Sequence, residues 1–434
     1  MTMTRIADPL TLWRNVVQAG GRQAYIAAQL EQRGFLVARR ETDGMSEREL
    51  AQYKQSLKAE AAERRKLRQE AWLAYRANHI VHLGDGVYWH DEATKDRWDL
   101  PYAEERAAEN ELPALDSPQQ LADALGLTVA QLRWLVFHRE AATRIHYHRF
   151  TIAKRDGSER PIWAPCKKLK AAQRWVLRNI VEKLLIHGAA HGFTAGCSVL
   201  SNARQHTNSR IVVKLDIRGF FPTVTLPRVR GVFRRAGYRD QLATLLALLC
   251  TEAPREVVEQ NGQTYYIALG PRCLPQGAPT SPALTNALCL RLDRRLTGLA
   301  HQLGWRYTRY ADDMTFSLPA GHTGAPRLGT LLGIVQRIVE EEGFRLHPDK
   351  THVARASSRQ KVTGLVVNGD GVPRVSRKLR RELRAAAHRL KHGKPLKEGE
   401  SLARLAGYAA YIHMSDPQRG AALLAAFKSA APAT

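Results

Sequence analysis

The sequence has few cysteines and no long apolar run, and these two absences limit the kinds of protein it can be. Its five cysteines are scattered, with no Cys-x-x-Cys pair, which argues against a zinc site and a disulfide framework. No apolar stretch approaches the roughly 18–20 residues that span a bilayer, and the first residues lack the apolar core of a signal peptide. We therefore expect a cytoplasmic protein that does not bind a membrane.

Acidic residues are also few compared with basic ones. The 434 residues include 66 Lys and Arg against 41 Asp and Glu, which gives a formal net charge of +25 at pH 7. Such an excess is typical of proteins that bind a polyanion, because phosphate neutralisation dominates affinity for nucleic acids. The charge does not distinguish DNA from RNA. The length allows two or three domains with cores of their own.

Three of the scarce acids occupy similar settings. Asp312 and Asp313 lie between two β-prone runs, which predicts a β-hairpin with both carboxylates at its tip. Asp216 ends an apolar strand pattern, where an unpartnered carboxylate is costly to bury. Like charges this close are unfavourable unless a cation lies between them. Carboxylates at neighbouring strand ends can hold two Mg²⁺ ions about 3.5–4 Å apart, the arrangement used for nucleotidyl transfer.

These acids are part of a larger pattern. The Leu-Pro-Gln-Gly-Ala-Pro-Thr-Ser-Pro segment at 274–282, the Tyr-Ala-Asp-Asp hairpin at 310–313 and the strand ending in Asp216 together resemble a reverse transcriptase in order and spacing. The resemblance implies an α+β right-hand polymerase, with fingers, a palm on an antiparallel sheet and a helical thumb. It also implies that Asp216, Asp312 and Asp313 are catalytic and hold two Mg²⁺, with the Ile217 carbonyl as a further ligand.

Shorter signals resemble the retron branch of this family. They are Asn-Ala-Arg-Gln-His at 202–206, Val-Thr-Gly at 362–364 and a short basic segment that follows. Membership would imply a bacterial enzyme that recognises one structured RNA and primes from an internal 2′-hydroxyl. Its product would be a branched RNA–DNA hybrid (msDNA), and it would act with an effector protein in phage defence. RNA-binding residues expected from this resemblance and from the basic segment are Asn202, His206, Arg377, Lys378, Arg381 and Arg384.

The resemblance also assigns residues to the incoming dNTP. Lys154 and Arg160, on opposite arms of a predicted hairpin, match the cations that grip the triphosphate. Phe221 follows Asp216 by five residues, and a ring there would clash with a ribose 2′-hydroxyl. Gln276 is expected to contact nucleotide or template, and Gly277 to let the backbone approach the base pair. Lys350 matches a lysine near the phosphates and is expected to be a general acid for pyrophosphate.

The rest of the chain gives a coarse division into three parts. Residues 1–115 form a mostly helical extension of unknown role, which includes a long charged helix at 47–78 after a capping box at Ser46 and a predicted hairpin at 79–89. Residues 116–368 form the fingers and palm, and 369–434 the basic helical thumb. The helical pair at 117–137 could alone be a DNA-reading helix-turn-helix.

RNA-directed DNA synthesis is the function that this pattern predicts best. Two alternatives stay open. One is a template-independent or protein-primed defence polymerase, which would make DNA of no fixed sequence attached to a Tyr or Ser. The other is an RNA-binding scaffold or effector inhibitor, whose biological function would survive loss of Asp312 and Asp313. The identity of the RNA, the priming nucleotide, the effector and the oligomeric state do not follow from the residues.

Overall fold

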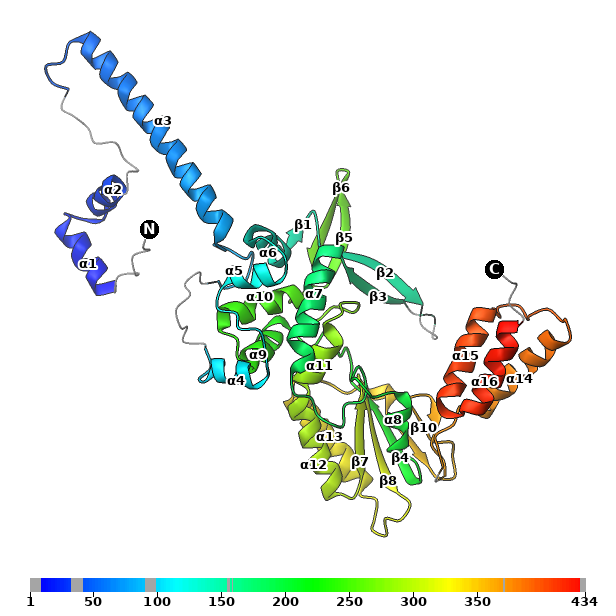
Figure 1. Cartoon of the computed structure of the whole chain (residues 1–434). Coiled ribbons are helices and arrows are strands. Elements are labelled where there is room, and N and C mark those ends of the chain that lie inside the picture. The colour runs from blue at the N-terminus through cyan, green and yellow to red at the C-terminus, as the bar shows by residue number, and fades with distance from the viewer. Residues whose placement is uncertain are drawn as a thin grey trace. The chain divides into compact units, whose positions relative to one another are not determined.

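The computed structural model describes residues 9–32, 42–89, 99–153, 157, 159–369 and 371–429. The chain divides into two compact units between Ile80 and Val81. The first unit contains the helices α1 (Pro9–Gln18), α2 (Arg22–Gln32) and α3 (Glu47–Asn78) (Figure 1). The predicted capping box starts α3: Ser46 Oγ accepts a hydrogen bond from the Glu49 amide, and the Glu49 carboxylate accepts one from the Ser46 amide. No residue of α3 is buried, as expected for a helix this rich in charge.

The second unit combines helices with small antiparallel sheets, which confirms the α+β class. Its helices are α4 (Ala103–Glu109), α5 (Pro118–Ala124), α6 (Val129–Val136), α7 (Lys167–Asn179), η1 (Val181–Lys183), α8 (Val199–Arg204), α9 (Leu226–Ala236), α10 (Asp240–Cys250), α11 (Ser281–Leu288), α12 (Leu290–Gln302), α13 (Leu328–Glu341), η2 (Pro348–Lys350), α14 (Arg377–Lys391), α15 (Leu402–Ser415) and α16 (Pro417–Ser429). Its strands are β1 (Ala141–Ala142), β2 (Tyr147–Ala153), β3 (Glu159–Pro165), β4 (Ser209–Asp216), β5 (Arg255–Gln260), β6 (Gln263–Ala268), β7 (Arg306–Tyr310), β8 (Asp313–Pro319), β9 (His352–Arg355), β10 (Lys361–Val362) and β11 (Leu365–Val366).

A four-stranded antiparallel sheet, in the order β7-β8-β4-β9, carries the predicted acids. Its strand β4 is buried along most of its length, as its run of β-branched residues predicts. The helix α12 packs against β7, and α13 packs against α12 (Figure 1). The predicted hairpin at 310–313 is confirmed, because β7 and β8 pair up to Tyr310 and Asp313.

The remaining sheets are smaller. The strands β1, β6 and β5 form one sheet, and β2 pairs with β3 in another. The helix α10 is buried at every position except Gln241, so it forms the core between the helices around it. Residues 99–115 pack on this helical region: Glu104 pairs with Arg239 at 2.8 Å, and the Tyr238 hydroxyl donates to the Pro113 carbonyl at 3.1 Å. These residues belong to the second unit, so the division of the chain lies before residue 115, the boundary expected from the sequence.

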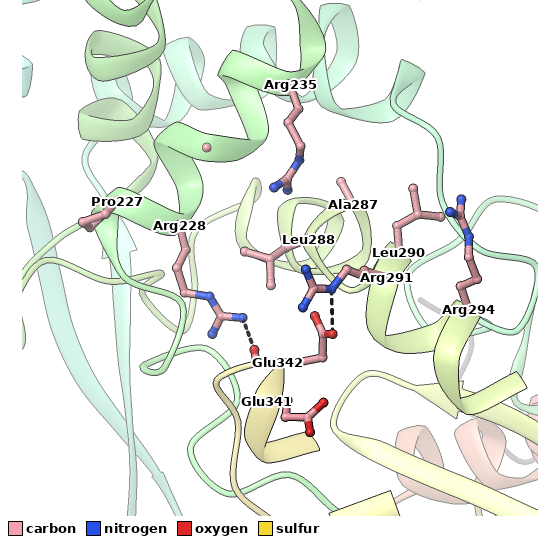
Figure 2. A pocket seen from close by; sticks show the side chains of 11 residues that line it. Pro227, Arg228, Arg235, Ala287, Leu288, Leu290, Arg291, Arg294, Glu341 and Glu342 are labelled. Atoms are coloured by element: carbon pink, nitrogen blue, oxygen red, sulfur yellow. Dashed lines mark hydrogen bonds and ion pairs between the residues drawn. The ribbon is translucent and has the colours of Figure 1, made fainter. Parts of the chain in front are cut away.

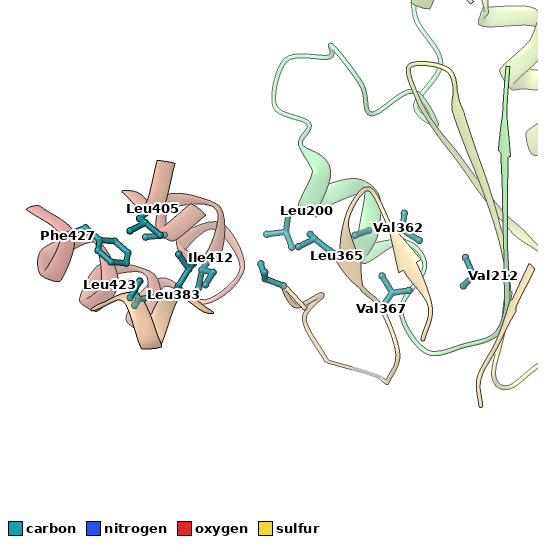
Figure 3. Close-up of a cluster of buried hydrophobic side chains, with 14 residues drawn as sticks. Leu200, Val212, Val362, Leu365, Val367, Leu383, Leu405, Ile412, Leu423 and Phe427 are labelled. Atoms are coloured by element: carbon teal, nitrogen blue, oxygen red, sulfur yellow. The ribbon is translucent and has the colours of Figure 1, made fainter. Parts of the chain in front are cut away.

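The last three helices pack on each other and on a short hairpin. Buried side chains of α14, α15 and α16, among them Leu383, Ile412 and Phe427, form one apolar cluster with residues of α8 and the β10–β11 hairpin (Figure 3). The Tyr411 hydroxyl donates to the Thr363 carbonyl at 3.4 Å. Apolar burial of this kind is the main force that holds the basic helix α14 in place.

One expectation from the sequence is wrong. Residues 79–89 do not form a hairpin, because Gly84 pairs instead with His138 in an isolated parallel bridge and Leu83 is fully buried. The strands β10 and β11 form a short hairpin, and its turn residues Thr363 and Gly364 both have positive φ. Among the described residues, no helix has both the length and the apolarity to cross a membrane.

Candidate active site

The three predicted acids meet at one end of the central sheet. Asp216 and Asp313 are directly opposite each other in the antiparallel register of β4 and β8. The Ile217 amide donates to the Asp312 carbonyl at 3.0 Å, which fixes the turn of the hairpin beside the end of β4. Segments nearly a hundred residues apart in the sequence therefore bring their carboxylates to the same place.

The buried side chain of Arg309 stabilises the hairpin turn. Ala311 has a φ of 56°, in the left-handed region that costs a non-glycine residue free energy. Its carbonyl accepts a hydrogen bond from Arg309 at 3.1 Å. The guanidinium group also forms two bonds to Asp293 on α12, at 2.9 and 2.7 Å, and both side chains are fully buried. This ion pair ties the turn to α12, and sequence reasoning missed it.

A glycine lets another segment approach the same turn. A Cβ on Gly192 would lie 2.6 Å from the Ala311 nitrogen, closer than side-chain atoms come to backbone. The Gly192 carbonyl accepts a hydrogen bond from Asn286, which also bonds Arg309. The contact explains a requirement for glycine at this position, because any side chain would displace the turn that carries Asp312.

Negative charge exceeds positive charge at this end of the sheet. Burial raises the pKa of Asp312, and the neighbouring carboxylates of Asp216 and Asp313 raise it further. Burial likewise raises the pKa of Asp313, although Lys214 at 3.9 Å opposes the rise. The Lys350 ammonium bonds both oxygens of Asp216, at 2.9 and 3.0 Å. The cluster would thus gain stability from further positive charge.

The donor atoms suit a hard cation such as Mg²⁺, which prefers carboxylate and carbonyl oxygens. The Ile217 carbonyl accepts no hydrogen bond from any residue that the structure describes, so it is free to act as a ligand. Within the described ranges, however, no three Asp, Glu, His or Cys side chains surround one point closely enough to hold a metal ion. Asp216 is turned to Lys350 instead. The residues fit a divalent cation in chemistry and location, and a cation there would compete with the Lys350 ammonium for Asp216.

The residues predicted to contact the nucleotide lie on several elements. Arg160 is exposed on β3, opposite Ile152 of β2, while Lys154 lies outside the described residues. Phe221 is half-buried, in the turn after β4, with its ring 5.8 Å from that of Phe220. Lys350 is exposed over about half of its side chain, although its ammonium bonds Asp216.

The loop at Gln276 and Gly277 is attached to β3. The Gln276 carbonyl accepts a hydrogen bond from the Trp163 amide at 2.7 Å. Gly277 has a φ of 121°, and a Cβ there would lie 2.6 Å from the Trp163 carbonyl oxygen. The close approach that requires this glycine is therefore to β3, and the Gln276 side chain is half-buried beside it.

Asn202 and His206 are buried, which disagrees with the prediction that they contact RNA directly. Asn202 is 1% exposed, and His206 is fully buried. The two ring nitrogens of His206 bond the hydroxyls of Ser317 and Thr308, each at 2.7 Å. Burial lowers the pKa of His206 to about 3, so the ring is neutral at pH 7. In this structure His206 joins α8 to the hairpin that carries Asp312 and Asp313.

The basic helix α14 presents its cations to solvent. Its apolar side, with Leu383 and Ala386, is buried, and the opposite side is exposed at the four positions predicted to bind RNA: Arg377, Lys378, Arg381 and Arg384. None of these four forms an ion pair within the described part of the chain. The helix is thus anchored by one face and offers free charge on the other.

Comparison with known proteins agrees with this geometry. Residues 152–367 match a family model described as reverse transcriptase (RNA-dependent DNA polymerase). The chain is 53% identical over 94% of its length to the Retron Mx162 reverse transcriptase of Myxococcus xanthus, covering 86% of that protein. It is 41% identical to the Retron Mx65 reverse transcriptase of the same organism, over 74% of this chain and 73% of that one. The Retron Ec86 reverse transcriptase of Escherichia coli is 32% identical over 65% of this chain and 81% of its own length.

Proposed function

This chain belongs to the retron reverse transcriptases and is an RNA-directed DNA polymerase, and from this we propose that it copies part of one structured non-coding RNA into a branched RNA–DNA hybrid (msDNA). The observation that carries the proposal is the placement of Asp216 opposite Asp313, with Asp312 in the adjoining turn. An RNA template and a DNA product are the partners of this reaction. Priming from an internal 2′-hydroxyl of the RNA follows from the retron resemblance.

Reverse transcriptases generally use divalent metal ions, and we assign two Mg²⁺ to this site. Asp216, Asp312, Asp313 and the Ile217 carbonyl would hold them. When bound, such ions activate the priming hydroxyl and stabilise the charge on pyrophosphate. The raised pKa values of Asp312 and Asp313 support this assignment, because two buried carboxylates side by side are destabilising without added positive charge.

Side chains around the acids would bind and orient the dNTP. Lys154 and Arg160 would hold the triphosphate, since cations aimed at it offset the charge of the leaving group. The Phe221 ring would exclude a 2′-hydroxyl, and Gln276 with Gly277 would support the nascent base pair. Lys350 is the general acid in this proposal: its ammonium lies beside the acids, and its exposed side chain has room to turn toward pyrophosphate.

The RNA would be held by the exposed face of α14. Arg377, Lys378, Arg381 and Arg384 have no ionic partner within the described chain and would bind phosphates. We assign residues 116–368 to fingers and palm and 369–434 to the thumb. An effector protein and a role in phage defence follow from the retron resemblance alone.

The product tests the proposal. Nucleic acid that copurifies with the full chain would be treated with RNase or DNase and sequenced, with the Asp312→Ala variant prepared in parallel. We expect DNA of one size joined to RNA, absent from the variant. Heterogeneous DNA, or DNA attached to protein, would support DNA polymerase activity but contradict the proposed retron product. RNA alone in both samples would favour a scaffold.

A further inference from the structure

A groove lined by arginines lies between α9, α11, α12 and the end of α13. It encloses about 560 Å³, and we call it the arginine groove after Arg228 and Arg235 of α9 and Arg291 and Arg294 of α12. Figure 2 shows Arg235 and Arg291 pointing toward the same space beside Leu288. None of the residues assigned above to catalysis, nucleotide or RNA lines it.

The groove holds more positive charge than its acids neutralise. Glu341 and Glu342 are its two carboxylates, and each already forms an ion pair with an arginine. Glu342 accepts bonds from Arg291 at 2.7 Å and from Arg295 at 2.8 Å, and Glu341 pairs with Arg295. The acids are therefore already shared with an arginine that does not line the groove.

The four arginines differ in how they are held. Arg228 donates to the backbone carbonyls of Thr223 and Glu342 and lies 4.3 Å over the Phe344 ring, so it is fixed in position. Arg235 and Arg294 have no hydrogen-bond or ionic partner anywhere in the described residues. Burial, and then the charge of Arg291, lower the pKa of Arg235. Arg235 and Arg294 thus both line the groove, and no anion of the described protein is bonded to either guanidinium group.

We propose that the arginine groove binds phosphate groups along the backbone of the RNA that this enzyme copies, at a place outside the active site. The inference rests on the proposed function for the identity of the RNA. Guanidinium groups donate two parallel hydrogen bonds to a phosphate, which suits the planar forks of Arg235 and Arg294.

The neighbouring arginines of α9 serve as a contrast. Arg230 and Arg234 point to the other side of the helix, where Asp240 lies 3.7 and 3.3 Å away. A buried aspartate thus neutralises one basic face of α9, whereas the face that lines the groove keeps an excess of positive charge. An excess of positive charge favours binding of a polyanion, because its phosphates neutralise the arginines and release counterions to solution.

The first test is binding of a fluorescein-labelled RNA hairpin to the full chain, measured by fluorescence anisotropy at several salt concentrations. Arg235→Ala/Arg294→Ala removes the two unpartnered arginines and leaves no acid without its partner. We expect binding to weaken about tenfold and the slope of log affinity against log salt to fall by about two. Arg235→Lys/Arg294→Lys keeps the charge and should restore most of the slope.

The matched control removes two exposed arginines elsewhere, as Arg178→Ala/Arg337→Ala. Neither Arg178 of α7 nor Arg337 of α13 lines the groove. Equal weakening in the control would show that only net charge matters and would overturn the proposal. Unchanged binding in Arg235→Ala/Arg294→Ala would do the same. Because this assay involves no DNA synthesis, either failure is separate from a failure to find RNA-linked DNA.

A second variant adds a side chain instead of removing one. A Cβ on Gly231 meets nothing within 4 Å, so Gly231→Glu places a carboxylate in the groove without a clash and removes a glycine from a helix. RNA should bind more weakly to this variant than to Gly231→Gln, which adds the same bulk without charge. Equal binding by the two variants would contradict the assignment.

Competition identifies the source of the phosphate. ATP and polyglutamate would be added to the complex of chain and RNA hairpin. We expect neither to displace the RNA at concentrations where a second, unlabelled hairpin does. Displacement by ATP that is lost in Arg235→Ala/Arg294→Ala would identify a free nucleotide as the ligand. Displacement by polyglutamate would indicate an acidic protein, and both outcomes would overturn the assignment to RNA.

Discussion

The Lys350 ammonium lies 2.9 Å from one carboxylate oxygen of Asp216 and 3.0 Å from the other. This bond pairs the most buried of the three acids with a positive charge. It would also compete with divalent ions, because a positive ammonium group at both oxygens of Asp216 repels a second cation there. In the proposed mechanism, Lys350 would leave Asp216 and turn toward the phosphates of the substrate.

This competition predicts two opposite effects of Lys350→Gln. The Mg²⁺ concentration for half-maximal DNA synthesis should fall, because Asp216 is released from the ammonium. The maximal rate should fall about a hundredfold, because a general acid is lost. Primer extension on an RNA template across a range of Mg²⁺ concentrations separates the two effects. An unchanged Mg²⁺ requirement would contradict the competition, and Lys361→Gln, an exposed lysine on β10, serves as the control.

The buried pair of Arg309 and Asp293 predicts a large loss of stability. Arg309→Met leaves the Asp293 carboxylate buried without a countercharge and should lower the free energy of unfolding by about 3–5 kcal/mol. The exposed pair of Arg419 and Asp416 is the control, since Arg419→Met should cost at most about 1 kcal/mol. Urea denaturation of the two variants makes the comparison, and similar midpoints would contradict the role of the buried pair.

His206 predicts a specific dependence of stability on pH. Its pKa is lowered from 6.5 to about 3 in the folded protein, mainly by burial. Below pH 6.5 the unfolded chain binds a proton that the folded chain does not, so stability should fall as the pH falls from 6.5 toward 3. His206→Gln should flatten this dependence and lower stability at neutral pH. If thermal unfolding of the two proteins shows the same pH slope, the ring is not buried in neutral form.

The proposed role of Phe221 predicts a preference for deoxyribonucleotides over ribonucleotides. Phe221→Ala should increase incorporation of ribonucleotides relative to deoxyribonucleotides, because the ring that would clash with the 2′-hydroxyl is removed. Phe221→Tyr keeps the ring and should keep the preference. The measurement compares primer extension with dNTPs and NTPs for each variant, and an unchanged ratio in Phe221→Ala would reject the steric role.

The sequence predicted the parts of this fold whose signals are local. The hairpin around Asp312 and Asp313, the strand ending in Asp216 and the capping box at Ser46 each lie within a few residues of the pattern that predicts them. The pairing of Arg309 with Asp293 was missed because an arginine and an aspartate 16 residues apart look like surface charge. The available signal was that Asp293 follows Leu292 on the apolar side of α12.

His206 shows a different limit of sequence reasoning. The motif at 202–206 marked the position, but it did not distinguish a residue that contacts RNA from one that packs inside the protein. Two hydroxyls more than a hundred residues away along the chain decide the matter, because they satisfy both ring nitrogens. The arginine groove could not be predicted from the sequence for the same reason, because four helices contribute to it.

The most direct test of the account is RNA-templated DNA synthesis by Asp312→Asn. This substitution keeps the shape of the side chain and removes its charge. A matched control is Asp349→Asn, which removes a carboxylate that is 87% exposed close to Lys350 in the sequence. With a defined RNA template, a DNA primer and Mg²⁺, we expect Asp349→Asn to extend the primer at the normal rate. Asp312→Asn should be at least about a thousandfold slower while it remains folded. Normal extension by Asp312→Asn would contradict the assignment of the active site.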